Sequence, residues 1–229
     1  MIPKIIHYIW VGSKIPESIQ NIIKTNNEFF YEYEVKIWTE ENMPKLNTFA
    51  QRAYDEKRWA FVSDYLRFTI LYQEGGIYLD TDMAVLKPLD DLLDNSFFAG
   101  WDRTGNYVYA GIIGVKPKNE YIKNILESYN NIDDQLYPTS PKIMTECYRK
   151  YDKKETLRIL DSSCFYPLLD GEKPSEKLLE DAYTNHLWHE SWRSYVPLRR
   201  MLRRLGLMKV YHSIGSRVQH VFQMKNKNK

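Results

Sequence analysis

A long apolar helix that leads through two glycines into a short apolar strand is the feature that most constrains this fold. Residues 61–72 (FVSDYLRFTILY) are apolar on nearly every side, which predicts a buried helix. Gly75 and Gly76 stand where a helix C-cap is expected, and a strand at 77–80 follows at once. A buried helix joined to a buried strand by so short a turn is typical of a layered α/β domain.

The same alternation of helices and strands extends to both sides of this stretch. Apolar patterns and turn residues predict strands at 2–12, 33–38, 97–101, 107–115 and 157–165, and helices at 16–27, 50–74, 119–129 and 142–151. Because the two types alternate over the first half of the chain, the sequence predicts an α/β fold with a mainly parallel sheet. We expect this domain to span residues 1–192 and a separate basic segment to follow at 193–229.

Two aspartates, Asp80 and Asp82, interrupt the apolar strand at its carboxyl end. Ligands of open α/β sheets bind at the carboxyl ends of the strands. The two-residue period of a strand places both side chains on one side if the strand continues that far. Such a pair can bind a hard divalent cation through oxygen, but an isolated Asp-X-Asp by itself favours two surface aspartates in a strand-to-loop turn.

The preceding helix favours the cation site, because it carries two charges in an apolar context. Asp64 and Arg67 lie three residues apart and therefore on one face of the helix. Two charges in a buried helix are costly unless they pair with each other or bind something polar. They could form an internal ion pair, or line a pocket and contact sugar hydroxyls or phosphate. The pocket is favoured because the same helix leads into the Asp80 strand.

Residues 63–83 (SDYLRFTILYQEGGIYLDTDM) closely resemble the sugar-binding region of the D-x-D glycosyltransferases. These are the yeast initiation mannosyltransferase-like and the bacterial capsular and lipopolysaccharide enzymes, with the large clostridial glucosylating toxins as distant relatives. The resemblance includes IPKIIHYIWVG at 2–12, TSP at 139–141 and YTNHLWHESW at 183–192. Ala110-Gly111 departs from it, since relatives often carry an Asn there, and Ser140 stands where relatives often have Gly. The resemblance implies a Rossmann-like GT-A fold, a nucleotide-sugar donor, Mn²⁺ or Mg²⁺ as cofactor, and retention of the anomeric configuration.

The resemblance also implies roles for individual residues. Asp82 would ligate the metal directly, and Asp80 would contact it through water or bind the ribose and sugar hydroxyls. His186 is the candidate third ligand, with His189 as its rival because only the register of the closing motif separates them. The implied catalytic residues are Asp64, Arg67 and Asp80. The implied donor-binding residues are Trp10, Val11, Asp64, Arg67, Tyr78, Asp80, Thr81, Ser191 and Trp192, with Trp10 stacking on uracil.

These roles describe an enzyme that moves a hexose from a nucleotide sugar to a lipid-linked or oligosaccharide acceptor in bacterial surface polysaccharide synthesis. UDP-galactose or a UDP-N-acetylhexosamine is the favoured donor. The alternatives are a mannosyltransferase using GDP-mannose, a protein-glucosylating enzyme, and a sugar-binding protein without catalysis. Retention fits either a double displacement, which needs a nucleophilic carboxylate, or a front-face reaction, which does not.

The C-terminal segment 193–229 has a different charge balance from the rest of the chain. It holds ten Lys and Arg and no acidic residue, whereas residues 1–192 hold 22 basic and 30 acidic ones. A helix there would separate Leu198, Met201, Leu202 and Leu205 from Arg199, Arg200, Arg203 and Arg204. An arginine-rich amphipathic helix is typical of an interfacial membrane segment, with about 1 kcal/mol per basic residue at an anionic surface. A helix packed on the domain and a solvated tail are the alternatives.

Two further expectations concern the surroundings of the protein. The acidic body disfavours nucleic acid as a partner. The sequence has neither a secretory leader pattern nor an apolar run of the ~18 residues that a membrane span needs. We therefore expect a cytoplasmic enzyme that associates peripherally with the inner face of the cell membrane.

Overall fold

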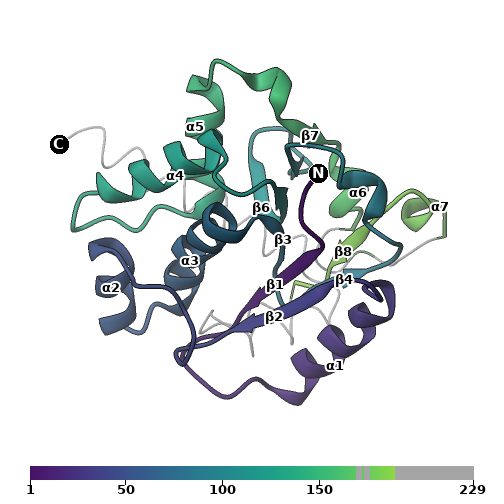
Figure 1. Cartoon of the computed structure of the whole chain (residues 1–229), viewed down its shortest axis with the longest axis horizontal. Coiled ribbons are helices and arrows are strands. Elements are labelled where there is room, and N and C mark those ends of the chain that lie inside the picture. Colours follow the sequence, from purple (N-terminus) through teal and green to yellow (C-terminus); the bar gives the residue numbers. More distant parts are fainter. Residues whose placement is uncertain (169–171, 173–175, 189–229) are drawn as a thin grey trace.

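A computed structural model describes residues 1–168, 172 and 176–188 of this chain (Figure 1). Its centre is a six-stranded sheet in the order β2-β1-β3-β6-β5-β7. The strands are β1 (Ile5–Ile9), β2 (Glu34–Trp38), β3 (Gly76–Leu79), β5 (Phe97–Trp101), β6 (Val108–Val115) and β7 (Arg158–Leu160). The pairs β1–β2, β1–β3 and β5–β7 are parallel, while β6 runs antiparallel to β3 and β5. The prediction of an α/β fold with a mainly parallel sheet is therefore confirmed.

Helices cover both faces of the sheet (Figure 1). One face packs against α2 (Thr48–Asp55), α3 (Trp59–Glu74), α4 (Glu120–Asn130) and α5 (Ser140–Lys150). The other face packs against α1 (Glu17–Asn26) and the short α6 (Ser162–Phe165). The remaining described helical segments are the short helix α7 (Glu176–Leu179) and 3₁₀ turns at Asn27–Phe29, Asp90–Leu92 and Lys154–Thr156. Each face of the sheet thus has its own apolar core.

Two predicted elements differ from the structure. The single helix expected at 50–74 is two helices, α2 and α3, because Lys57 between them adopts a left-handed backbone with φ of 58° that interrupts the hydrogen-bond ladder. The strand expected at 157–165 ends as β7 at Leu160, and α6 follows directly. Asp161 starts α6, since its carboxylate accepts a hydrogen bond from the Ser163 N–H at 2.9 Å.

The two glycines before β3 fix that strand closely against β1. Gly76 has a φ of 93°, and a Cβ there would lie 2.7 Å from the Ile5 carbonyl oxygen and 2.9 Å from His7 Nε2. The buried His7 ring donates from Nε2 to the Gly75 carbonyl (2.8 Å) and accepts at Nδ1 from the Trp38 indole N–H (3.1 Å). The parallel strands β1 and β3 therefore end side by side at one edge of the sheet.

A two-stranded ribbon extends the chain beyond β3. Its strands, β4 (Met83–Val85) and β8 (Thr184–His186), are antiparallel, and Met83 lies opposite His186. The buried Asn26 side chain of α1 anchors β4, because it donates to the Met83 carbonyl and accepts from the Val85 N–H, each at 2.8 Å. Among the described residues, no helix has both the length and the apolar character needed to cross a membrane.

Candidate active site

The chain turns immediately after β3, and this turn carries the two aspartates. The Asp80 N–H donates to the Gly111 carbonyl of β6 at 2.8 Å, and the Asp80 carbonyl accepts from the Met83 N–H at 2.9 Å. The strand ends at Leu79, so Asp82 does not share a face with Asp80 through strand periodicity. Instead, the turn and the β4–β8 ribbon bring Asp82 to the site.

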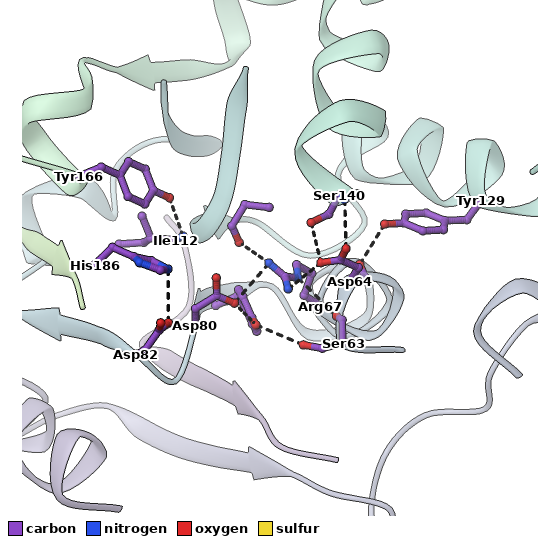
Figure 2. Close-up of polar contacts among 12 residues, drawn as sticks. Ser63, Asp64, Arg67, Asp80, Asp82, Ile112, Tyr129, Ser140, Tyr166 and His186 are labelled. Atoms are coloured by element: carbon purple, nitrogen blue, oxygen red, sulfur yellow. Dashed lines mark hydrogen bonds and ion pairs between the residues drawn. The ribbon is translucent and has the colours of Figure 1, made fainter. Parts of the chain in front are cut away.

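Asp80, Asp82 and His186 form a cluster with the composition of a metal site (Figure 2). One ligand atom from each lies within 4.8 Å of the others, and His186 Nε2 is 3.4 Å from Asp82 Oδ1. All three residues are partly exposed, which leaves room for a ligand. Carboxylate oxygens and one imidazole nitrogen suit Mn²⁺, and the oxygens also suit Mg²⁺, so the residues fit the implied cofactor.

The Arg67 guanidinium lies at the centre of a buried network that reaches this cluster (Figure 2). Its Nη2 is 2.8 Å from Asp64 Oδ1, and its Nη1 is 3.4 Å from Asp80 Oδ1. Nη1 also donates to the Ala110 carbonyl at 2.8 Å, and the guanidinium lies 4.6 Å from the centroid of the Tyr78 ring. Asp64 and Arg67 are thus an internal ion pair that also supports Asp80.

Asp64 is engaged by protein groups on both carboxylate oxygens. Its Oδ1 accepts from the Ser140 hydroxyl at 2.6 Å and its Oδ2 from the Ser140 N–H at 3.1 Å, in addition to the Arg67 contact. Burial raises the pKa of Asp64, while the Arg67 charge and the two Ser140 hydrogen bonds oppose this rise. The expected contact of Asp64 with the donor sugar stays a prediction.

Tyr78 and Arg67 together hold one oxygen of Asp80. The Tyr78 hydroxyl donates to Asp80 Oδ1 at 2.6 Å and lies 3.4 Å from the Ser63 hydroxyl. Burial raises the Tyr78 pKa well above its ordinary value, so this hydroxyl keeps its proton. For Arg67, burial by itself lowers the pKa, but the surrounding Tyr78, Asp80 and Asp64 outweigh it and leave the pKa raised. Asp80 is therefore held by a permanent cation and a permanent hydrogen-bond donor.

Two of the expected donor-binding residues, Trp10 and Val11, lie at the end of the neighbouring strand β1. Trp10 directly follows β1, is partly exposed, and donates from its indole N–H to the Ser13 hydroxyl at 3.3 Å. Val11 is buried, and Gly12 directly contacts the Trp59 ring, where a Cβ would collide with that ring. Thr81 is partly exposed within the turn. Stacking of Trp10 on a base remains a prediction, although its strand ends beside the Asp80 strand.

Several expected residues lie outside the part of the chain that the structure describes. These are the rival metal ligand His189, the donor-binding candidates Ser191 and Trp192, and the whole basic segment 193–229. Of the two candidate histidines, His186 is the one that the structure describes, and it lies against Asp82.

Sequence reasoning missed three residues that support the site. Ser63 contacts Tyr78, Ser140 binds Asp64, and the Tyr166 hydroxyl accepts from the Ile112 N–H at 3.2 Å beside Asp80 (Figure 2). Ser140 was noted only as a departure from the family pattern, although Ser-Pro is a helix-start signal that could have placed its N–H at the first turn of α5. No local pattern distinguishes Tyr166 from the many other aromatic residues of this chain.

Comparison with known proteins finds glycosyltransferases among the similar sequences. The family described as "Glycosyltransferase sugar-binding region containing DXD motif" matches residues 16–99. An uncharacterized glycosyltransferase of Acanthamoeba polyphaga mimivirus is 28% identical over 86% of this chain and 86% of its own length. Inositol phosphoceramide mannosyltransferase 3 of Schizosaccharomyces pombe is 36% identical over 40% of this chain, but only 27% of its own length is covered.

A solved structure is similar in fold. The PaToxG glycosyltransferase superposes with a TM-score of 0.51 at 18% identity, over 68% of this chain and 73% of that one. The fold is of the GT-A class, and the sequence matches identify the chain as a glycosyltransferase. Residues 16–99 thus match the sugar-binding region of DXD-containing glycosyltransferases, and the DXD motif of this chain is Asp80-Thr81-Asp82.

Proposed function

We propose that this protein is a metal-dependent, retaining glycosyltransferase that transfers a hexose from a nucleotide sugar to a glycan or lipid-linked acceptor. The observation that carries the proposal is the convergence of Asp80, Asp82 and His186 within 4.8 Å at the carboxyl edge of the sheet. Asp82 and His186 would hold Mn²⁺ or Mg²⁺, with Asp80 as a direct or water-mediated ligand. A bound divalent ion supplies positive charge that stabilises the diphosphate leaving group.

The chain's own residues would prepare the site for that ligand set. Arg67 and the Tyr78 hydroxyl fix Asp80 Oδ1, so the carboxylate needs no reorganisation when the donor arrives. Asp64 and Ser140 in turn fix Arg67, because Asp64 supports the guanidinium and Ser140 supports Asp64. Trp10, which follows β1, would stack on the base of the donor, and the pairing of β1 with β3 supports this role.

The donor we favour is UDP-galactose or a UDP-N-acetylhexosamine. Mannose transfer is a second candidate, because the Schizosaccharomyces pombe relative described above is named as a mannosyltransferase. The acceptor we propose is a growing surface glycan at the cytoplasmic face of a membrane. Support for the membrane comes from the sequence of segment 193–229, whose arginines and leucines would lie on different sides if the segment were helical.

The first experiment measures release of nucleoside diphosphate from a panel of UDP- and GDP-sugars, with Mn²⁺ and with a chelator. Chelator-sensitive release from one donor is the expected result, and it identifies the sugar at the same time. Donor binding that is the same with Mn²⁺ and with chelator would contradict the metal-dependent reaction and favour a sugar-binding protein. The anomeric configuration of the product, read by NMR, tests retention.

Removal of residues 198–229 tests the proposed membrane segment. We expect the shortened protein to move from vesicles containing anionic lipid to the supernatant, while donor turnover in solution is unchanged. Equal sedimentation of the full and shortened chains with these vesicles would contradict a role of this segment in membrane binding.

A further inference from the structure

Gly111 lies opposite Asp80 and places no side chain against the Asp80 carboxylate or the Tyr166 hydroxyl. The Asp80 N–H donates to the Gly111 carbonyl at 2.8 Å, so the two residues are direct neighbours across β3 and β6. A Cβ at Gly111 would lie 3.2 Å from Asp80 Oδ2 and 3.2 Å from the Tyr166 hydroxyl. Gly111 is not among the glycines with positive φ, so its backbone conformation is one that other residues adopt. Glycine is therefore favoured here by space and not by backbone geometry.

The two oxygens of Asp80 have different environments. Oδ1 accepts from the Tyr78 hydroxyl and lies 3.4 Å from Arg67 Nη1. Oδ2 is the oxygen that faces the Gly111 position, and no residue in the described part of the chain donates a hydrogen bond to it. Since the Asp80 side chain is 27% exposed, Oδ2 is the oxygen available to a ligand.

Tyr166 brings a hydroxyl to the same position. Its ring is fully buried, 5.1 Å from the Tyr109 ring, and its oxygen accepts from the Ile112 N–H at 3.2 Å. A tyrosine hydroxyl also has one proton to donate, and the described residues offer this one no hydrogen-bond acceptor. Burial raises the pKa of Tyr166, and the charge of Asp80 raises it further, so the hydroxyl stays protonated.

A buried hydroxyl whose proton has no acceptor is costly, and Asp80 Oδ2 faces the same Gly111 position as this hydroxyl. Both atoms lie within 3.2 Å of the point that a side chain at residue 111 would occupy. An oxygen just beyond that point could donate to Asp80 Oδ2 and accept from Tyr166 at once. Only an oxygen that is both donor and acceptor, such as a hydroxyl group or water, satisfies both partners.

We infer that Tyr166 is a ligand-binding residue, which together with Asp80 Oδ2 binds one hydroxyl or water oxygen beside Gly111, the position that carries no side chain. This inference rests on the proposed function, which supplies two sources for the oxygen: a hydroxyl of the donor sugar, or a water bound to the metal. The two sources share the same hydrogen bonds, but they differ in whether the sugar must be present.

The test compares Tyr166→Phe, Gly111→Ala and the control Tyr109→Phe with the natural chain. Tyr109 packs on Tyr166, and its hydroxyl forms no hydrogen bond to the described residues. Tyr109→Phe therefore controls for the removal of one tyrosine oxygen next to the same ring. Tyr166→Phe removes the donor but also the acceptor of the Ile112 N–H. Gly111→Ala keeps both groups and fills the space between them, so the two variants test the same position independently. Thermal unfolding confirms that each variant is folded.

Titration calorimetry in Mn²⁺ measures the Kd of UDP and of UDP-galactose, with GDP and GDP-mannose in parallel. We expect both test variants to bind the sugar nucleotide about three- to tenfold more weakly, the usual cost of one hydrogen bond, with Tyr109→Phe unchanged. Unchanged UDP affinity assigns the oxygen to the sugar, and an equal loss for UDP assigns it to metal-bound water.

Two outcomes would overturn the inference. Natural affinity of Tyr166→Phe for every nucleotide and sugar nucleotide would do so while leaving the proposed function intact. The same would follow if Tyr109→Phe lost as much affinity as Tyr166→Phe. Failure of the natural chain to bind any nucleotide or nucleotide sugar would instead overturn the proposed function, and this inference with it.

Discussion

His186 Nε2 lies 3.4 Å from Asp82 Oδ1, although the two residues are far apart in the sequence. The contact exists because β8 pairs with β4, which begins at the residue after Asp82. The Leu187 N–H also donates to the Asp82 carbonyl at 2.9 Å. The end of β8 therefore contacts Asp82 through both its backbone and the His186 side chain. The candidate metal site is therefore assembled by a strand pairing and not by the DXD turn alone.

Asp82→Asn should weaken Mn²⁺ binding by more than about tenfold, because an amide is a far poorer ligand than a carboxylate and a lost contact to a metal site typically costs that much. Calorimetry of the protein with Mn²⁺ measures this directly, and nucleoside diphosphate release should fall with it. Asp152→Asn, at an exposed position, is the matched control. Natural Mn²⁺ affinity in Asp82→Asn would remove Asp82 from the ligand set.

Ser140→Ala should lower the free energy of unfolding by about 2 kcal/mol, since the buried Asp64 carboxylate loses a hydrogen bond of 2.6 Å. Urea unfolding followed by tryptophan fluorescence provides the measurement. Ser128→Ala removes a hydroxyl that donates to Asn124 within α4, and we expect a change within about 0.5 kcal/mol. Equal effects of the two substitutions would show that the Ser140–Asp64 bond adds no particular stability.

His7 should make the stability depend on pH. Burial lowers the pKa of His7 below its ordinary 6.5, while the Gly75 hydrogen bond and nearby Glu74 oppose this shift. The unfolded chain therefore binds a proton at His7 more readily than the folded one. This contribution is complete above about pH 6.5 and is lost as the pH falls through the folded pKa. Urea midpoints between pH 5 and 8 test it.

The control for this pH dependence is His7→Gln, which removes the titrating ring. The difference in unfolding free energy between this variant and the natural chain should shrink as the pH is lowered. Glu34 and Lys36 lie near His7 and remain in both proteins, so their own titration cancels in the comparison. A difference that is constant from pH 5 to 8 would show that His7 is not the group responsible.

Gly76→Ala should destabilise the protein more than Gly105→Ala. Both glycines have positive φ, 93° and 68°, so each substitution has a backbone cost of about 1–2 kcal/mol. At Gly105 the new methyl would meet nothing within 4 Å, whereas at Gly76 it would lie 2.7 Å from the Ile5 carbonyl. We expect at least about 1 kcal/mol of additional loss at Gly76, measured by urea unfolding. Equal losses of unfolding free energy in the two variants would mean that β1 and β3 can move apart to admit the methyl group without a free-energy cost.

Much of the fold could be predicted from local patterns. The apolar strand after Gly75-Gly76 and the capped helices are encoded by a few neighbouring residues each, and they are where they were expected. The break between α2 and α3 could not be predicted, because it depends on Lys57, a residue with no turn preference, adopting a left-handed backbone. The antiparallel β6 was equally hidden, since strand direction depends on the path of the chain between strands.

The candidate site also has residues that the sequence indicated and residues that it did not. Asp80, Asp82, Asp64 and Arg67 lie close together in sequence, so their spacing alone indicated that they act together. Their partners Ser140 and Tyr166 come from distant segments, and only the packing of α5 and of the turn after α6 brings them close. The expectation that Asp80 and Asp82 share a face of one strand was wrong, because the strand stops at Leu79.

The pairing of β4 with β8 also sets when the site can be completed during synthesis. A chain leaves the ribosome N-terminal end first, and its early elements can fold before the rest has emerged. The β1–α3–β3 region, with Asp64, Arg67 and the DXD turn, is made long before β8. Until His186 emerges, the nascent protein has the acidic turn but lacks the third candidate ligand. Binding of the metal by all three candidate ligands would therefore wait until β8 has been made and has paired with β4.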